Sequence, residues 1–181
     1  RDGGEEPQVA AVYAVDEAGV PRRLGFATGN DWSAHETERI NYLYLAGSKL
    51  MPCAIGPELV LDAPFGDLRG RVRILRGGGV LVEAELKSGD ANMCHSLANI
   101  EDHHFKYPQH RAPGDVHVHF LGASAISFGK RGPYRDGDRV EVSWDGLGAA
   151  LVNPVAVPGR AAAPVAVAAP ADGRVGTMPG W

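Results

Sequence analysis

The chain of 181 residues has 18 Lys and Arg against 22 Asp and Glu, a formal net charge of −4 at pH 7. This length suffices for one domain whose core needs no disulfide or metal staple. Interspersed charges of acidic balance argue against nucleic acid as a partner, and no apolar run reaches the roughly 18 residues of a membrane span. The two cysteines, Cys53 and Cys94, form no framework, so we expect reduced, buried thiols in a cytoplasmic protein.

The first half of the chain reads as hairpins and one helix. Residues 8–15 (QVAAVYAV) predict a strand, the DEAG sequence a turn, and residues 20–29 a returning strand that ends at Asn30 and Asp31. A helix is expected over 36–47 and a short strand over 55–61. Residues 70–86 predict a second hairpin, because alternating apolar residues flank a triple-glycine turn.

The second half continues in the same manner. The spacing of apolar residues predicts a helix within 90–107, capped by Asp90. Strands are expected over 114–121 and 123–128, and a last hairpin over 137–155. From about residue 155 the composition shifts to Ala, Pro and Val, which divides the chain into a domain (1–154) and a tail or arm (155–181).

About nine strands and two helices, with hairpins throughout and no βαβ rhythm, predict a strand-dominated α+β fold. Its core is expected to be a mixed, largely antiparallel β-roll or barrel with two covering helices.

Carboxylates meet at the open end of the first predicted hairpin. Glu5 and Glu6 precede its first strand and Asp31 ends its second, so pairing brings Glu6 within several ångströms of Asp31. Converging carboxylates with water are what Mg²⁺ prefers, although charged residues that open a strand are often only solvated. Lys49 is either a surface residue or, if it points into the same cavity, a cation for an enolate or oxyanion.

The histidines suggest a second kind of site. His117 and His119 lie on one face of a strand, as zinc or iron ligands do, and His103 and His104 stand at a predicted helix end. Packing and the favourable helix dipole explain the same histidines without a metal, and we favour that interpretation. No nucleophile elbow, P-loop or dinucleotide fingerprint is found.

Five blocks in order carry a resemblance to a known family: EEPQVAAVY, GNDWSA, GSK…PCAIGPELV, GDVHVHFLG and GLGAALVNPV. Together they resemble the fumarylacetoacetate hydrolase superfamily over roughly residues 3–155. The longer stretches NYLYLAGSKLMPCAIGPEL and ANMCHSLANIEDHHFKYPQHRAPGDVHVHF look most like its bacterial branch of 2-keto-3-deoxy sugar-acid (arabonate-type) dehydratases. The resemblance implies a β-roll core, a dimer, and Mg²⁺ (or Mn²⁺) that chelates a 2-keto acid and stabilises an enolate.

The resemblance also implies the metal ligands. Glu6 matches the first glutamate of the family's Glu-x-Glu pair, and Asp31 matches its aspartate. The second glutamate falls on Gln8, whose amide oxygen can still coordinate a metal but brings no negative charge, so a weaker affinity for Mg²⁺ is expected.

Other family positions fall on residues expected to contact the substrate. Lys49 matches the lysine that assists the developing oxyanion, and His35 stands where the family usually has an arginine, so a fixed bidentate donor becomes a titratable one. In the glycine-rich loop near Gly122, the usual threonine falls on Ala123, with Ser124 as a possible substitute. Lys49 and His35 are thus the predicted catalytic residues, and Gly122 and Ser124 the predicted substrate contacts.

The resemblance leaves three functions open. The first is a metal-dependent enzyme on a small 2-keto acid, most specifically dehydration of a 2-keto-3-deoxy sugar acid in sugar-acid catabolism. The second is a C–C hydrolase of acylpyruvates or diketo acids. The third is a catalytically silent structural or binding subunit, because family members usually carry an upstream segment with acid/base residues and this sequence starts at Arg1. We expect a homodimer, or a partner chain that supplies the missing segment.

Overall fold

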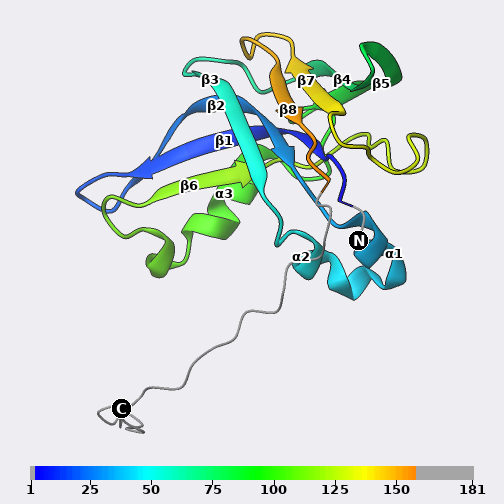
Figure 1. The fold of residues 1–181 in the computed structure, drawn as a ribbon. Helices are drawn as coiled ribbons and strands as arrows, with labels where there is room; N and C mark the ends of the chain where they lie inside the picture. Colours follow the sequence, from blue (N-terminus) through cyan, green and yellow to red (C-terminus); the bar gives the residue numbers. More distant parts are fainter. Residues whose placement is uncertain (1–2, 158–181) are drawn as a thin grey trace, which may run out of the picture.

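Two four-stranded antiparallel sheets make up the computed structural model, which describes residues 3–157 (Figure 1). In the first sheet the order is β3 (Cys53–Val60), β2 (Pro21–Asp31), β1 (Pro7–Val15) and β6 (Val116–Phe120). In the second it is β5 (Gly79–Ser88), β4 (Leu68–Arg76), β7 (Arg139–Trp144) and β8 (Leu151–Pro154). The predicted strand-dominated α+β class is therefore confirmed.

Short helices complete the described part of the chain: α1 (His35–Ile40), α2 (Leu45–Ser48) and α3 (Leu97–Phe105), with 3₁₀ turns at Tyr42–Tyr44 and Pro108–His110. Helix α3 lies against the first sheet near β6, whereas α1 and α2 stand at the end where β1 begins and β2 ends (Figure 1). None of the described helices is long and apolar enough to cross a membrane.

The β1–β2 hairpin has the predicted register at its open end. Pro7 pairs with Asn30, and the backbone N–H of Asp31 donates to the carbonyl of Glu6 at 3.0 Å. Since side chains alternate between the faces of a strand, Glu6 and Gln8 share one face of the first sheet with Asp31 opposite them.

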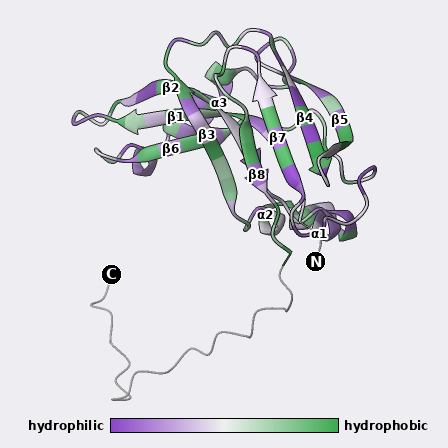
Figure 2. Cartoon of the chain, turned by 45° about the horizontal axis from the view of Figure 1, so that its top comes forward, coloured by the Kyte–Doolittle hydropathy of each residue, from purple (hydrophilic) through white to green (hydrophobic). Residues whose placement is uncertain are grey.

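The core lies between the sheets, and its buried residues come from both. Figure 2 shows apolar residues along the strands of each sheet. Fully buried members include Val9 in β1, Val72 and Ile74 in β4, and Val140 in β7. Trp144 at the end of β7 adds a polar tie, because its indole N–H donates to the carbonyl of Gln8 at 3.1 Å. The second sheet thus fixes the start of β1, where the carboxylates lie.

The helix predicted over 36–47 is wrong as a continuous element. Helix α1 ends at Ile40, and Asn41 takes an extended conformation with its side-chain oxygen accepting from the N–H of Leu43. An Asn that caps a new turn in this way competes with continuation of the helix. The large apolar residues of this segment are mostly exposed: Leu43 is 84% accessible.

The strand predicted over 123–128 is also absent from the described structure. Side chains hold this segment as a loop: the N–H of Ser127 donates to Glu5, and the hydroxyl of Ser124 accepts from the N–H of Lys87. Helix α3 starts later than predicted, at Leu97, because Ser96 caps it.

Two smaller predictions have mixed outcomes. Cys53 and Cys94 are free, as expected, but both are exposed rather than buried. The chain leaves β8 at Pro154, and Val155 is still anchored by its N–H to the carbonyl of Asp138. Nearly all of the predicted arm, residues 158–181, lies outside the described residues.

Candidate functional site

The predicted metal ligands come together where β1 begins and β2 ends. The Nε2 amide of Gln8 donates to Glu6 Oε2 at 3.1 Å and to Asp31 Oδ2 at 3.4 Å. Both carboxylates are mostly covered, with side-chain exposures of 13% and 17%. Gln8 therefore faces the site as predicted, but it offers the carboxylates its N–H groups rather than offering a cation its oxygen.

Lys49, directly after α2, reaches into the same cluster. Its Nζ lies 2.5 Å from Glu6 Oε1, 3.6 Å from Asp31 Oδ2 and 2.9 Å from the hydroxyl of Ser33. The main chain prepares this approach, because the N–H of Ala34 donates to the carbonyl of Ser48 at 3.0 Å and so joins the start of α1 to the end of α2. Lys49 is thus a member of the cluster and not a plain surface residue.

Helix α1 contributes His35 and Glu38, one turn apart on the same face. His35 Nε2 lies 3.4 Å from Glu6 Oε1, and Glu38 Oε1 lies 3.6 Å from Lys49 Nζ. Ser48 holds Glu38 in place with a hydrogen bond of 2.5 Å. The sequence analysis missed Glu38, although its i, i+3 spacing from His35 was a signal that could have found it.

The electrostatics of the cluster favour an added cation. Burial would raise the pKa of Glu6, but its contacts with His35 and Lys49 outweigh burial and hold that pKa below its usual value. Burial, together with the charges of Glu6 and Glu38, raises the pKa of Asp31 against the opposing charge of Lys49. Three carboxylates surround one ammonium, which leaves two negative charges uncompensated when all are ionised.

These residues fit a divalent cation. Carboxylates within reach of one another are suitable hard ligands for such an ion. Among residues 3–157, the group of three or more His, Cys, Asp and Glu whose ligand atoms lie within 4.8 Å of one another is Glu6, His35 and Glu38. It shares only Glu6 with the predicted set.

Gly122 and Ser124 lie in the loop that follows β6 and not on the elements that form the cluster. Gly122 follows Leu121, whose N–H donates to the carbonyl of Val9, so the loop starts beside β1. The hydroxyl of Ser124, however, is committed to β5 through Lys87. Their assignment as substrate contacts stays a prediction.

His104 of α3 forms a packed group of rings with His110, His117 and His119, which lie beneath this helix. The rings of His104 and His117 meet with Nε2 and Nδ1 3.2 Å apart, and His119 packs on Tyr13 at 4.7 Å between centroids. Burial lowers the pKa of His119 to about 4, helped by the neighbouring His104 and His117. The packing interpretation of these residues agrees with this arrangement.

Two hollows lie away from the carboxylates. The larger, about 700 Å³, is lined mainly by apolar residues together with Asn30, which is bonded to Asn153. Asn30 is adjacent to Asp31 on β2, so the two side chains point to opposite faces.

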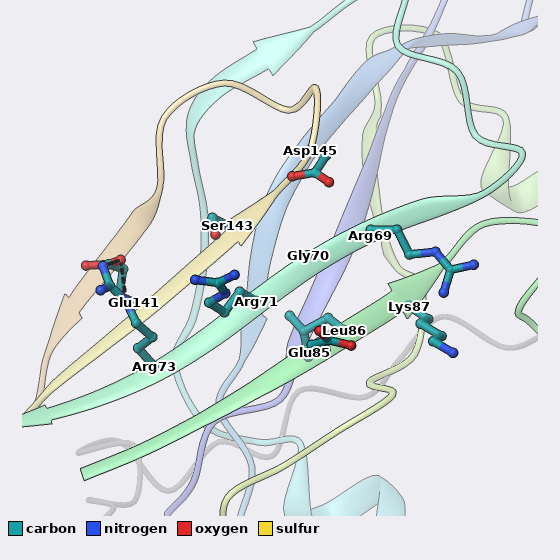
Figure 3. A pocket seen from close by; sticks show the side chains of 10 residues that line it. All are labelled: Arg69, Gly70, Arg71, Arg73, Glu85, Leu86, Lys87, Glu141, Ser143 and Asp145. Carbon is teal, nitrogen blue, oxygen red and sulfur yellow. Dashed lines mark hydrogen bonds and ion pairs between the residues drawn. The ribbon is translucent and has the colours of Figure 1, made fainter. Parts of the chain in front are cut away.

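The second hollow, about 390 Å³, lies on the outer face of β4, β5 and β7 (Figure 3). Its arginines have acidic neighbours, for example Arg73 with Glu141 and Arg69 with Asp67. It is therefore a solvated, charge-paired sheet face rather than an anion site.

The fold has counterparts among solved structures. A 2-keto-3-deoxy-D-arabinonate dehydratase complexed with magnesium and 2,5-dioxopentanoate superposes with a TM-score of 0.69 at 25% identity, over 86% of this chain and 53% of the dehydratase. The 2-hydroxyhepta-2,4-diene-1,7-dioate isomerase from Mycobacterium marinum has a TM-score of 0.61 at 26% identity, over 88% of this chain and 61% of the isomerase. No family model and no curated protein sequence matches the chain.

Fold, motif order and these similarities place the chain in the fumarylacetoacetate hydrolase superfamily. The chain spans about half the length of the dehydratases it matches.

Proposed function

We propose that the chain is a divalent-metal-dependent enzyme acting on a small 2-keto acid. The observation that carries the proposal is the convergence of Glu6, Asp31 and Glu38 around the ammonium of Lys49. Three partly buried carboxylates that share one ammonium carry an excess of negative charge, which a bound cation would neutralise. The magnesium-bound dehydratase structure and the isomerase of the same fold support the choice of substrate class.

The residues of the cluster would have two roles, metal binding and stabilisation of an oxyanion. A bound Mg²⁺ or Mn²⁺ supplies Lewis-acid stabilisation of an enolate. Glu6 and Asp31 are the carboxylates that would hold the ion, with Gln8 contributing its amide oxygen if the amide turns. Burial lowers the pKa of Lys49, but Glu6 and the other carboxylates outweigh it and raise that pKa above its usual value. Lys49 therefore stays an ammonium, suited to pair with an oxyanion and unsuited to act as a base.

The most specific form of the proposal is dehydration of a 2-keto-3-deoxy sugar acid. A base would remove a proton from C3, the Lys49 ammonium would pair with the enolate oxygen, and the C4 hydroxyl would take up a proton, in net terms the one lost from C3, and leave as water. Hydrolysis of an acylpyruvate is the enzymatic alternative, since it needs the same enolate stabilisation. The assay separates them: dehydration yields a semialdehyde, and hydrolysis yields two acids.

Both substrates are offered to the purified chain with millimolar Mg²⁺ or Mn²⁺, and with EDTA. We expect metal-dependent turnover of the sugar acid, lost in Asp31→Asn and in Lys49→Met. Turnover that persists in EDTA would overturn the metal mechanism, and cleavage of the acylpyruvate alone would select the hydrolase.

A silent structural or binding subunit is favoured by one observation, the amide of Gln8. Its N–H groups already satisfy Glu6 and Asp31, so the carboxylates are stabilised without any ion. The thermal midpoint decides between the classes. Metal at about 100 times its dissociation constant adds roughly 2.7 kcal/mol to folding, and no shift in Mg²⁺ or Mn²⁺ would favour the silent subunit.

We also propose that the chain forms a homodimer in the cytoplasm. Exposed apolar side chains gather between α1 and the residue after Lys49: Ile40, Tyr42, Leu43, Tyr44 and Leu50. Such a patch is more than a monomer usually exposes, and the free thiols suit a reducing compartment. Sedimentation equilibrium of the chain and of Leu43→Asp tests the dimer, which the variant should weaken.

A further inference from the structure

Glu6 presents its two carboxylate oxygens to different neighbours. Oε2 accepts from Gln8, on the side of Asp31, whereas Oε1 meets Lys49 and His35. On this second side, Glu6, His35 and Glu38 each offer a ligand atom within 4.8 Å of the others. Ligand atoms on one first-row ion stand roughly 3 to 4 Å apart, so small side-chain rotations close the gap.

His35 is the independent sign that a ligand belongs here. The residue is 3% exposed, and neither ring nitrogen makes a hydrogen bond within the described structure. Gly4 packs on the Nδ1 side so closely that a Cβ there would lie 2.4 Å from this atom, while the ring of Phe128 meets His35 edge-on at 5.3 Å. The imidazole is thus held in place with Nε2 3.4 Å from Glu6 Oε1, and Nδ1 has no polar contact of this kind.

We infer that the ion of this protein is held by Glu6, Glu38 and Nε2 of His35, and that it is a nitrogen-accepting ion such as Mn²⁺ rather than Mg²⁺. An imidazole ligand favours Mn²⁺, Fe²⁺, Co²⁺ and Zn²⁺, while Mg²⁺ prefers oxygen and gives up its waters reluctantly. This rests on the proposed function and revises one part of it, because Glu38 and His35 take the place of Asp31 and Gln8 as ligands of the ion.

An ion held in this way would displace the Lys49 ammonium from Glu6 and Glu38. Its ammonium lies 2.5 Å from Glu6 Oε1 and so stands on the side where the ion would bind. Ser33 at 2.9 Å and Asp31 at 3.6 Å already contact the same ammonium. Lys49 therefore keeps two partners when the ion takes Glu6, and it stays close enough to face a chelated substrate.

The test measures binding and spectroscopy rather than activity. The EDTA-treated chain is titrated with MnCl₂ and with MgCl₂ by calorimetry, and bound Mn²⁺ is examined by pulsed EPR for hyperfine coupling to ¹⁴N. We expect Mn²⁺ to bind at least about tenfold more tightly than Mg²⁺, with a ¹⁴N signal. His35→Gln should remove the signal and weaken Mn²⁺ by about tenfold or more, and Glu38→Gln should weaken Mn²⁺ while the signal stays.

The control is His117→Gln, the same exchange in the histidine group beneath α3, which should leave both readouts unchanged. Equal binding of the two ions without a ¹⁴N signal would overturn the inference and leave the proposed function standing. Binding of neither ion would overturn both. If His35→Gln fails to fold, the presence or absence of the ¹⁴N signal in the unaltered chain still shows whether a nitrogen atom binds the Mn²⁺.

Discussion

Replacing Gln8 with Glu tests whether the cluster is built for a cation. In the structure the Gln8 amide is 3.1 Å from Glu6 Oε2 and 3.4 Å from Asp31 Oδ2, and the residue is 3% exposed. A carboxylate at that position turns two hydrogen bonds into two repulsions. Without metal the folded protein should lose stability, and with metal the new carboxylate should become a ligand.

The magnitude follows from these distances. Repulsion between two charges about 3 Å apart is about 5 kcal/mol at an effective dielectric constant of 20. The new carboxyl escapes part of this by taking up a proton, which at pH 7 costs at most about 4 kcal/mol. A loss of about 2–4 kcal/mol is therefore expected in EDTA, or a thermal midpoint lower by roughly 5–15 °C.

The assay is the thermal midpoint in EDTA and in excess Mn²⁺ or Mg²⁺, for Gln8→Glu and for Gln109→Glu. Gln109 is an exposed residue of the second 3₁₀ turn, so its exchange should change stability by less than about 0.5 kcal/mol. Metal should restore the midpoint of Gln8→Glu and shift it further than in the unaltered chain. An unchanged midpoint in EDTA would refute the reasoning, because Gln8 could not then face the two carboxylates.

Further predictions concern the supports of the site and the histidine group. Gly4→Ala should lose about 1–3 kcal/mol in urea unfolding, since its Cβ would lie 2.4 Å from His35 Nδ1, whereas Gly129→Ala, with open space around it, should not. Glu5→Gln should cost about 2–4 kcal/mol by the same measurement, because the buried carboxylate accepts from the loop that follows β6. The depressed pKa of His119, about 4, means that the unfolded chain binds the extra proton between pH 6.5 and 4, so stability falls as the pH falls through that window. His119→Phe should reduce the loss between pH 7 and 5 by about 1–2 kcal/mol, and an unaltered pH profile would contradict this assignment.

The sequence predicted those parts of the fold that alternation and turn residues encode. The β1–β2 hairpin, the hairpin at the triple glycine and the last hairpin all formed, because apolar alternation sets which face of each strand is buried. The continuous helix predicted across Asn41 was wrong because apolar spacing suggested one helix, whereas the Asn41 side chain caps a new turn. Residues 123–128 were misread because Glu5, far away in sequence, binds their backbone.

The sequence predicted the part of the candidate site that depends on pairing within the first hairpin. Glu6, Gln8 and Asp31 meet because hairpin register is a local consequence of the sequence. The i, i+3 spacing from His35 places Glu38 on the same face of α1, but its approach to Lys49 depends on how α1 turns back after β2, which the sequence pattern does not reveal. The hydroxyl of Ser124 accepts a hydrogen bond from the N–H of Lys87 in β5, a contact that depends on how the two sheets pack.

Two of the departures from the family pattern, Gln8 and His35, lie on opposite sides of the Glu6 carboxylate. Gln8 removes a negative ligand on the Oε2 side of Glu6, and His35 adds a neutral nitrogen on the Oε1 side. A cluster with one carboxylate fewer attracts Mg²⁺ less strongly, since that ion depends on charge and oxygen donors. The same cluster loses little for an ion that binds imidazole. The presence of Gln8 and His35 in place of the family's glutamate and arginine therefore points to a different ion at a different set of ligands, not simply to the loss of a metal site.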